Sequence, residues 1–124
     1  MQKAGLSEDS QAAAKAQKRS RRFSRHPFDA RIQVSVFREG KTATYWGRAN
    51  ELGLDGIGAT LNGELQAGEV VSLEFPIPLP PHVMKVRAAV CYSEGLRCGF
   101  EFLVVTGEQR LTLRQVCVVL ANIS

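Results

Sequence analysis

Residues 28–36, Phe-Asp-Ala-Arg-Ile-Gln-Val-Ser-Val, decide the fold class of this chain. Apolar residues occupy every second position of this stretch, and a period of two predicts a strand with one buried face. Similar patterns predict five further strands, at about residues 42–49, 57–61, 71–77, 83–92 and 96–104. Turn signals that contain glycine separate several of these stretches, and prolines at 76, 78, 80 and 81 end the fourth strand.

The end of the chain has a different period. Thr106-Gly-Glu-Gln109 has the spacing of a capping box, in which a threonine hydroxyl accepts a hydrogen bond from a free amide of the first helical turn. Apolar residues then recur at helical spacing, at positions 113, 116, 117 and 120. We therefore predict a mainly β protein, a six-stranded antiparallel β-barrel with a C-terminal α-helix packed on it. Closure of the barrel removes the exposed edges of an open sheet.

Length and composition limit the class of protein. A chain of 124 residues, 44% of them hydrophobic, is long enough for one domain with its own core. The apolar runs are too short to cross a membrane, and the polar N-terminus does not resemble a secretory signal. Three cysteines without a C-x-x-C pair disfavour a disulfide framework and a zinc site. We expect a cytoplasmic protein in a reducing environment, with no metal, no cofactor and no membrane insertion.

The positive charge is concentrated at the N-terminus. Residues 1–26 contain seven of the 16 basic residues and two of the 12 acidic ones, so the remaining chain carries a net charge of −1. Small and polar residues dominate this segment, which is typical of a disordered region. We predict a flexible basic arm at residues 1–19 that attracts anions, followed by a single domain at residues 20–124.

The most informative motif lies where this arm meets the first strand. Residues 20–25 read Ser-Arg-Arg-Phe-Ser-Arg and place Arg21 and Arg25 four positions apart, with Arg22 between them. A guanidinium group is a rigid, planar fork of donors that binds a phosphate through two hydrogen bonds or stacks on an aromatic base. Two such groups on a flexible segment can therefore contact both parts of one nucleotide.

The order of these parts resembles the PilZ domain, a six-stranded bacterial barrel that binds the second messenger cyclic di-GMP. The R-x-x-x-R motif of that family is present as Arg21 and Arg25. Its D/N-x-S-x-x-G motif falls on residues 51–56, and its closing Gly-x-x-Phe strand is similar to residues 98–102. The resemblance covers about residues 20–121 and implies binding of cyclic di-GMP. The ligand-binding residues that it implies are Arg21, Arg22, Arg25, Glu51, Gly53 and Gly56.

The second motif departs from the family pattern at two of its three defining positions. Glu51 replaces Asp or Asn and keeps an acceptor on a longer side chain, whereas Gly53 lacks the hydroxyl of the usual serine. Gly56 matches. A shift of one residue would place Asn50 at the acceptor position and would misalign Gly56. Restoring both family residues, with Glu51→Asp and Gly53→Ser, is expected to strengthen binding.

Three functions from different classes follow from these observations. The first is a single-domain cyclic di-GMP receptor, an adaptor that signals to an unidentified effector protein. The second is a degenerate PilZ barrel that does not bind nucleotide and acts as a protein-interaction module. The third is a nucleic-acid binder that uses the basic arm, with a largely electrostatic and steeply salt-dependent affinity, and it ranks below the other two. No catalytic constellation is visible in the sequence, so we do not expect an enzyme.

Overall fold

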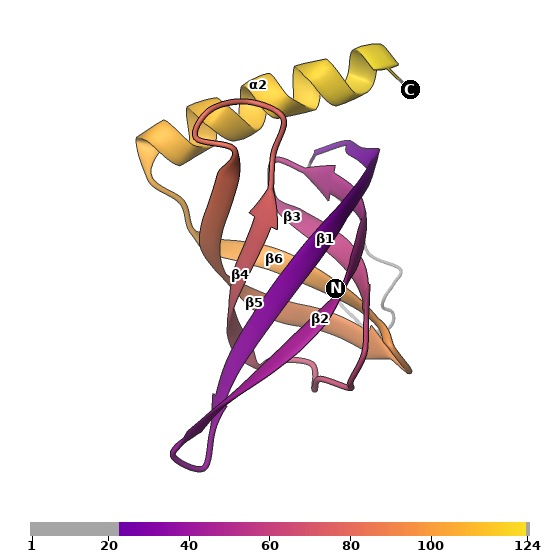
Figure 1. Cartoon of the computed structure of the whole chain (residues 1–124), viewed down its shortest axis with the longest axis vertical. Coiled ribbons are helices and arrows are strands. Elements are labelled where there is room, and N and C mark those ends of the chain that lie inside the picture. Colours follow the sequence, from indigo (N-terminus) through magenta and orange to yellow (C-terminus); the bar gives the residue numbers. More distant parts are fainter. Residues whose placement is uncertain (1–22, 124) are drawn as a thin grey trace, which may run out of the picture.

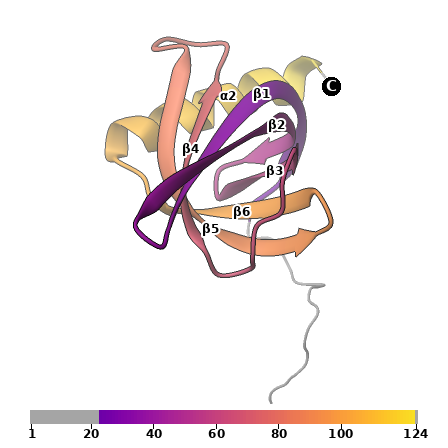
Figure 2. The same cartoon turned by 60° about the horizontal axis from the view of Figure 1, so that its bottom comes forward.

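The computed structural model describes residues 23–123, which form a closed antiparallel barrel and one helix (Figure 1). The predicted arm at residues 1–19 lies outside the described residues. The strand order around the barrel is β1-β2-β3-β6-β5-β4, and β4 returns to β1 (Figure 2). The strands are β1 (Arg25–Arg38), β2 (Lys41–Gly53), β3 (Gly56–Leu61), β4 (Val70–Pro76), β5 (Val83–Glu94) and β6 (Arg97–Val104). The six predicted strands and the predicted barrel are confirmed.

Strand β1 closes the barrel. It pairs with β2 from Arg25↔Gly53 to Arg38↔Lys41, and its middle also pairs with β4. The strand is longer at both ends than the predicted stretch 28–36, because pairing with β2 continues beyond the buried apolar positions. The predicted alternation is confirmed, since Ile32 and Val34 are fully buried while Asp29 and Arg31 are exposed.

The core fills the barrel with side chains from all six strands. Phe28 and Phe75 meet edge to face, with ring centroids 6.0 Å apart. Phe75 and Phe100 are the largest side chains with less than 2% exposure, so strands β4 and β6 contribute the bulkiest parts of the core. The interior is therefore packed with apolar groups, and a polar ligand has to bind to the outer surface or at an end of the barrel.

Helix α2 (Gly107–Ile123) lies across one end of the barrel, away from the β1–β2 hairpin (Figure 1). The predicted capping box is present: the Gln109 amide donates to Thr106 Oγ1 at 3.0 Å, and the Thr106 amide donates to Gln109 Oε1 at 3.1 Å. The predicted apolar face is the buried one. It consists of Leu113, Val116, Cys117 and Leu120.

The β5–β6 hairpin differs from expectation by one residue. The sequence predicted that the sixth strand begins at residue 96, but the register pairs Glu94 with Arg97 and Ser93 with Cys98, so β6 begins at Arg97. The two turn residues are therefore Gly95 and Leu96, and Gly95 adopts a φ of 64° that suits glycine. Cys98 therefore faces Ser93, and Cys91 lies at a register shift between Val90 and Tyr92.

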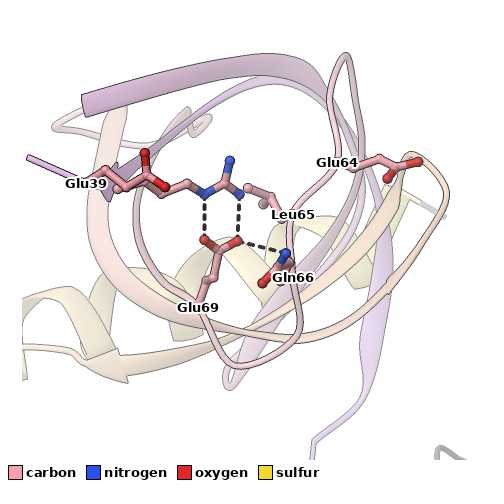
Figure 3. A pocket seen from close by; sticks show the side chains of 6 residues that line it. Glu39, Glu64, Leu65, Gln66 and Glu69 are labelled. Carbon is pink, nitrogen blue, oxygen red and sulfur yellow. Dashed lines mark hydrogen bonds and ion pairs between the residues drawn. The ribbon is translucent and has the colours of Figure 1, made fainter. Parts of the chain in front are cut away.

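An ion pair joins the β1–β2 hairpin to the segment before β4. The Arg38 guanidinium donates from Nε and Nη2 to the two carboxylate oxygens of Glu69, both at 2.7 Å, and from Nη1 to the Tyr45 hydroxyl. One Glu69 oxygen also accepts the Gln66 amide, and the group lines an open hollow of about 530 Å³ (Figure 3). The hydrogen bonds from Arg38, followed by that from Gln66, hold the pKa of Glu69 below its ordinary value.

This ion pair predicts a pH-dependent contribution to stability. Because the pKa of Glu69 is lower in the folded protein, the contribution is present above the ordinary value of 4.5 and is lost as the pH falls through the folded value. Glu69→Gln is therefore expected to lower the urea midpoint at pH 7, and the difference from the parent should shrink at pH 3.

Glu64→Gln serves as the matched control. Glu64 lines the same hollow, and the described residues give it no ion pair. Its replacement should change the midpoint little at either pH. A constant difference between the parent and Glu69→Gln from pH 7 to pH 3 would contradict the assigned role of the Glu69 carboxylate.

Candidate ligand-binding site

The register of β1 and β2 carries Arg25 to the turn between β2 and β3. Arg25 pairs with Gly53, the last residue of β2. Its Nε donates to Asp55 Oδ1 and its Nη1 donates to Glu51 Oε2, each at 3.3 Å, and its side chain is only 11% exposed. The motif residues Arg25 and Glu51, which are 26 positions apart in sequence, are therefore in direct contact.

Beside this contact, four glycines without side chains leave the backbone of the outer face of the barrel bare. We call Gly53, Gly56, Gly58 and Gly99 the glycine floor. Gly58 and Gly99 pair directly with each other across β3 and β6, while their sequence neighbours Ile57 and Phe100 point into the core. Adding a Cβ to Gly56 would overlap the Phe100 carbonyl oxygen, and at Gly99 it would overlap the Tyr92 ring. These positions accept no side chain without rearrangement.

Three side chains of different chemistry lie over the glycine floor. Arg25 covers Gly53 and Gly56, and Glu51 covers Gly58, because a Cβ built there would lie 3.1 Å from Glu51 Cγ. Tyr92 covers Gly99 from the other side and is 36% exposed.

The register places two of these side chains in one row. Glu51 pairs with Gly58, Gly58 with Gly99, and Gly99 with Tyr92, so the row crosses four neighbouring strands. Three strand spacings separate the backbones of Glu51 and Tyr92, a distance of about 14 Å. The Glu51 carboxylate and the Tyr92 ring therefore lie over two adjacent glycines, with the Arg25 guanidinium beside Glu51. Charged hydrogen-bonding groups and an aromatic ring on one face suit a planar ligand that carries negative charge.

Asp55 lies between the glycine floor and helix α2. Its carboxylate accepts from Arg25, and its backbone carbonyl accepts the Phe102 amide at 2.9 Å, which holds the turn against β6. Burial raises the pKa of the Cys117 thiol on α2, and the nearby Asp55 carboxylate adds to this effect. The turn that carries the second motif is therefore close to the helix as well as to Arg25.

The space around Gly53 bears on the expectation that a serine at this position strengthens ligand binding. A Cβ on this residue would lie 2.7 Å from the Ser24 carbonyl oxygen and 2.9 Å from Arg25 Cδ. The first neighbour is backbone, so a serine at 53 requires Ser24 to shift. In the described conformation, Gly53→Ser therefore disturbs the segment that carries Arg25, and the expected gain in binding does not follow. A glycine at this position allows Arg25 to lie close to the turn.

Sequence reasoning identified part of this site. It named Arg25, Glu51, Gly53 and Gly56, which the fold brings together, whereas Arg21 and Arg22 lie outside the described residues. It did not identify Asp55 or Tyr92 as site residues. Asp55 had a sequence signal, since it is an acidic residue inside the second motif. Tyr92 had no sequence signal, because the side of the strand on which its ring lies depends on the register shift after Val90.

The adjacent aromatic residues Tyr45 and Trp46 in β2 face opposite sides of the strand. Tyr45 packs against the core, whereas Trp46 is 42% exposed. The Arg31 guanidinium carbon lies 4.8 Å from the centroid of the Trp46 ring, on the outer face of β1 and β2. The aromatic ring beside the glycine floor is Tyr92 instead.

Comparison with protein families decides the classification. The sequence profile of the PilZ domain matches residues 19–118, most of the chain. The chain belongs to the PilZ domain family. The resemblance drawn from Arg21, Arg25 and the second motif is therefore confirmed. A search of curated proteins gave no significant match.

Solved structures show the same PilZ fold. The PilZ domain of YcgR from Escherichia coli, solved with c-di-GMP, has 20% identity and a TM-score of 0.64, covering 84% of this chain and 93% of that one. A second structure of YcgR in complex with c-di-GMP has 26% identity and a TM-score of 0.64, covering 82% of this chain and 46% of that one. The Bacillus subtilis inhibitor of motility MotI/DgrA has 18% identity and a TM-score of 0.63, with coverage of 81% and 50%.

Within residues 23–123, no group of three or more His, Cys, Asp or Glu side chains is arranged to hold a metal ion. Over the same part of the chain, no helix has the length and apolar character needed to cross a membrane.

Proposed function

We propose that this PilZ domain binds cyclic di-GMP on the outer face of its barrel and passes the signal to a partner protein. The observation that carries the proposal is the row Glu51, Gly58, Gly99 and Tyr92 with Arg25 beside it. Membership of the PilZ family and the two YcgR structures that contain c-di-GMP support it.

Each group over the glycine floor matches one part of this ligand. Arg25 offers a forked donor to a phosphate or a guanine edge, and Tyr92 offers a ring on which a base can stack. The Glu51 carboxylate can accept hydrogen bonds from the N–H groups of guanine.

Calorimetric titration of the full chain with cyclic di-GMP tests the proposal, and cyclic di-AMP is the matched control. Both ligands carry the same two phosphates, but adenine lacks the N1–H and N2–H groups of guanine that can donate hydrogen bonds to a carboxylate. We expect saturable binding of cyclic di-GMP and much weaker binding of cyclic di-AMP. Equal binding of the two would indicate general attraction of anions, and binding of neither would overturn the proposal.

Tyr92 provides a sharper prediction for the same site. Stacking of a base on an aromatic ring contributes about 1–3 kcal/mol, so Tyr92→Ala should weaken cyclic di-GMP binding by about 5- to 150-fold. Tyr92→Phe keeps the ring and should retain most of the affinity. Trp46→Ala removes an exposed ring from the outer face of β1 and β2 and should have little effect. Similar losses for Tyr92→Ala and Trp46→Ala would contradict the assignment.

A specific observation favours a second function, a protein-interaction module that does not bind nucleotide. Arg25 is already paired with two carboxylates, and Gly53 lacks the serine hydroxyl of the family motif. The titration above separates the two functions. A folded chain that binds no cyclic di-GMP would leave the interaction module as the better proposal.

A further inference from the structure

Arg25 contacts two carboxylates in the described structure. Its guanidinium group lies 3.3 Å from Glu51 Oε2 and 3.3 Å from Asp55 Oδ1, so two acidic side chains already occupy its donors. The carboxylate side chains are 28% and 25% exposed, and that of Arg25 is 11% exposed, so solvent screens this group only in part. A phosphate that binds Arg25 therefore has to compete with these carboxylate contacts.

The two carboxylates are not equivalent. Glu51 occupies the acceptor position of the family motif and lies over Gly58, where it faces the glycine floor. Asp55 lies in the turn after β2, at a position that the motif leaves unspecified. Its backbone carbonyl accepts the Phe102 amide, so the turn is held to β6 independently of the carboxylate. The Asp55 carboxylate is therefore not needed to hold the turn to β6.

We infer that Asp55 is an internal competitor for Arg25, an anion of the chain itself that occupies the guanidinium until a ligand phosphate displaces it. The carboxylate takes the Nε donor, which belongs to the fork that would otherwise bind a phosphate through two hydrogen bonds. The inference rests on the proposed function for the identity of the ligand, while the competition applies to any phosphate at Arg25. Asp55 thereby sets the ligand concentration at which the site fills.

Removing the charge should strengthen binding. Asp55→Asn keeps the size of the side chain and leaves the backbone contact with Phe102, but it removes the repulsion toward a phosphate and weakens the hold on Arg25. For a partly exposed charge contact, we expect cyclic di-GMP to bind about three- to tenfold more tightly. The matched control is Asp29→Asn. Asp29 pairs with Arg48 at 2.8 Å on the outer face of β1 and is 83% exposed, so the variant removes the same charge elsewhere.

Two measurements test the inference. Calorimetry compares the affinity of the parent and both variants for cyclic di-GMP, and ¹⁵N NMR follows the Arg25 Nε–H signal during titration with inorganic pyrophosphate. We expect Asp55→Asn to shift the Nε–H signal in the free protein and to reach half-saturation with pyrophosphate at a lower concentration. Asp29→Asn should match the parent in both experiments.

The outcomes separate this inference from the proposed function. If cyclic di-GMP binds none of the proteins but pyrophosphate binds more tightly at Arg25 in Asp55→Asn, the competition is supported and the proposed ligand is wrong. If Asp55→Asn folds and binds both ligands no more tightly than the parent, the inference is overturned, and weaker binding would identify Asp55 as a group that positions Arg25. Equal gains in the two variants would indicate a general charge effect and would also overturn it.

Discussion

Replacing Arg25 with alanine is expected to weaken cyclic di-GMP binding by about 10- to 150-fold, which corresponds to the 1.5–3 kcal/mol of a hydrogen bond to a charged group. The effect should be large because Arg25 is the described guanidinium that lies over the glycine floor. Calorimetry of the folded variant measures it. Arg25→Lys keeps the charge but loses the planar fork, so it should recover only part of the affinity.

Arg48→Ala is the matched control for this loss. Arg48 pairs with Asp29 on the outer face of β1 and β2, and its side chain is 59% exposed. It carries the same charge as Arg25 without facing the glycine floor, so the variant should bind cyclic di-GMP almost as well as the parent. Equal losses for Arg25→Ala and Arg48→Ala would show that the chain attracts anions by its overall charge, and the assigned site would then be wrong.

The largest expected effect on stability comes from Phe100 in β6. It is 1% exposed and belongs to the core of the barrel, so Phe100→Ala removes buried apolar surface and leaves a cavity. We expect the free energy of unfolding to fall by about 3–5 kcal/mol, measured by urea denaturation. A loss of this size is a large fraction of the stability of a small domain.

Phe37→Ala makes the same change at an exposed position and serves as the control. Phe37 is 71% exposed on the outer face of β1, so its replacement should change the free energy of unfolding by less than about 0.5 kcal/mol. The comparison separates the effect of burial on the free energy of unfolding from the effect of the intrinsic preference of phenylalanine for a strand. Losses of similar size in the two variants would contradict the core assigned to the barrel.

The strands and the helix could be predicted because their signals are local. In β1, alternation from Phe28 to Val36 reports which side of the strand is buried, whatever the strand pairs with. The capping box at Thr106 and the apolar spacing from Leu113 to Leu120 likewise depend on residues within a few positions of one another. The barrel followed from counting such elements, and membership of the PilZ family agreed with it.

The candidate site could be predicted only where a motif marked it. Arg25, Glu51, Gly53 and Gly56 belong to two short motifs, and closure of β1 against β2 brings them together. The roles of Arg21 and Arg22 remain predictions. Asp55 was within the motif segment, but its contact with Arg25 depends on how the β2–β3 turn meets the start of β1.

The sequence by itself determined the strand pattern, the helix and the presence of a cationic motif before the first strand, because each depends on neighbouring residues. The tertiary structure alone decided that Tyr92 lies over Gly99 and that Cys91 does not face Cys98. Cys98 pairs with Ser93 because the hairpin turns at Gly95 and Leu96, and Tyr92 faces outward because of the register shift between Val90 and Tyr92. A shift of one residue exchanges the two faces of a strand. The sequence around Gly95 fits a turn at 94–95 as well as one at 95–96, so the pairing of the strands has to decide between them.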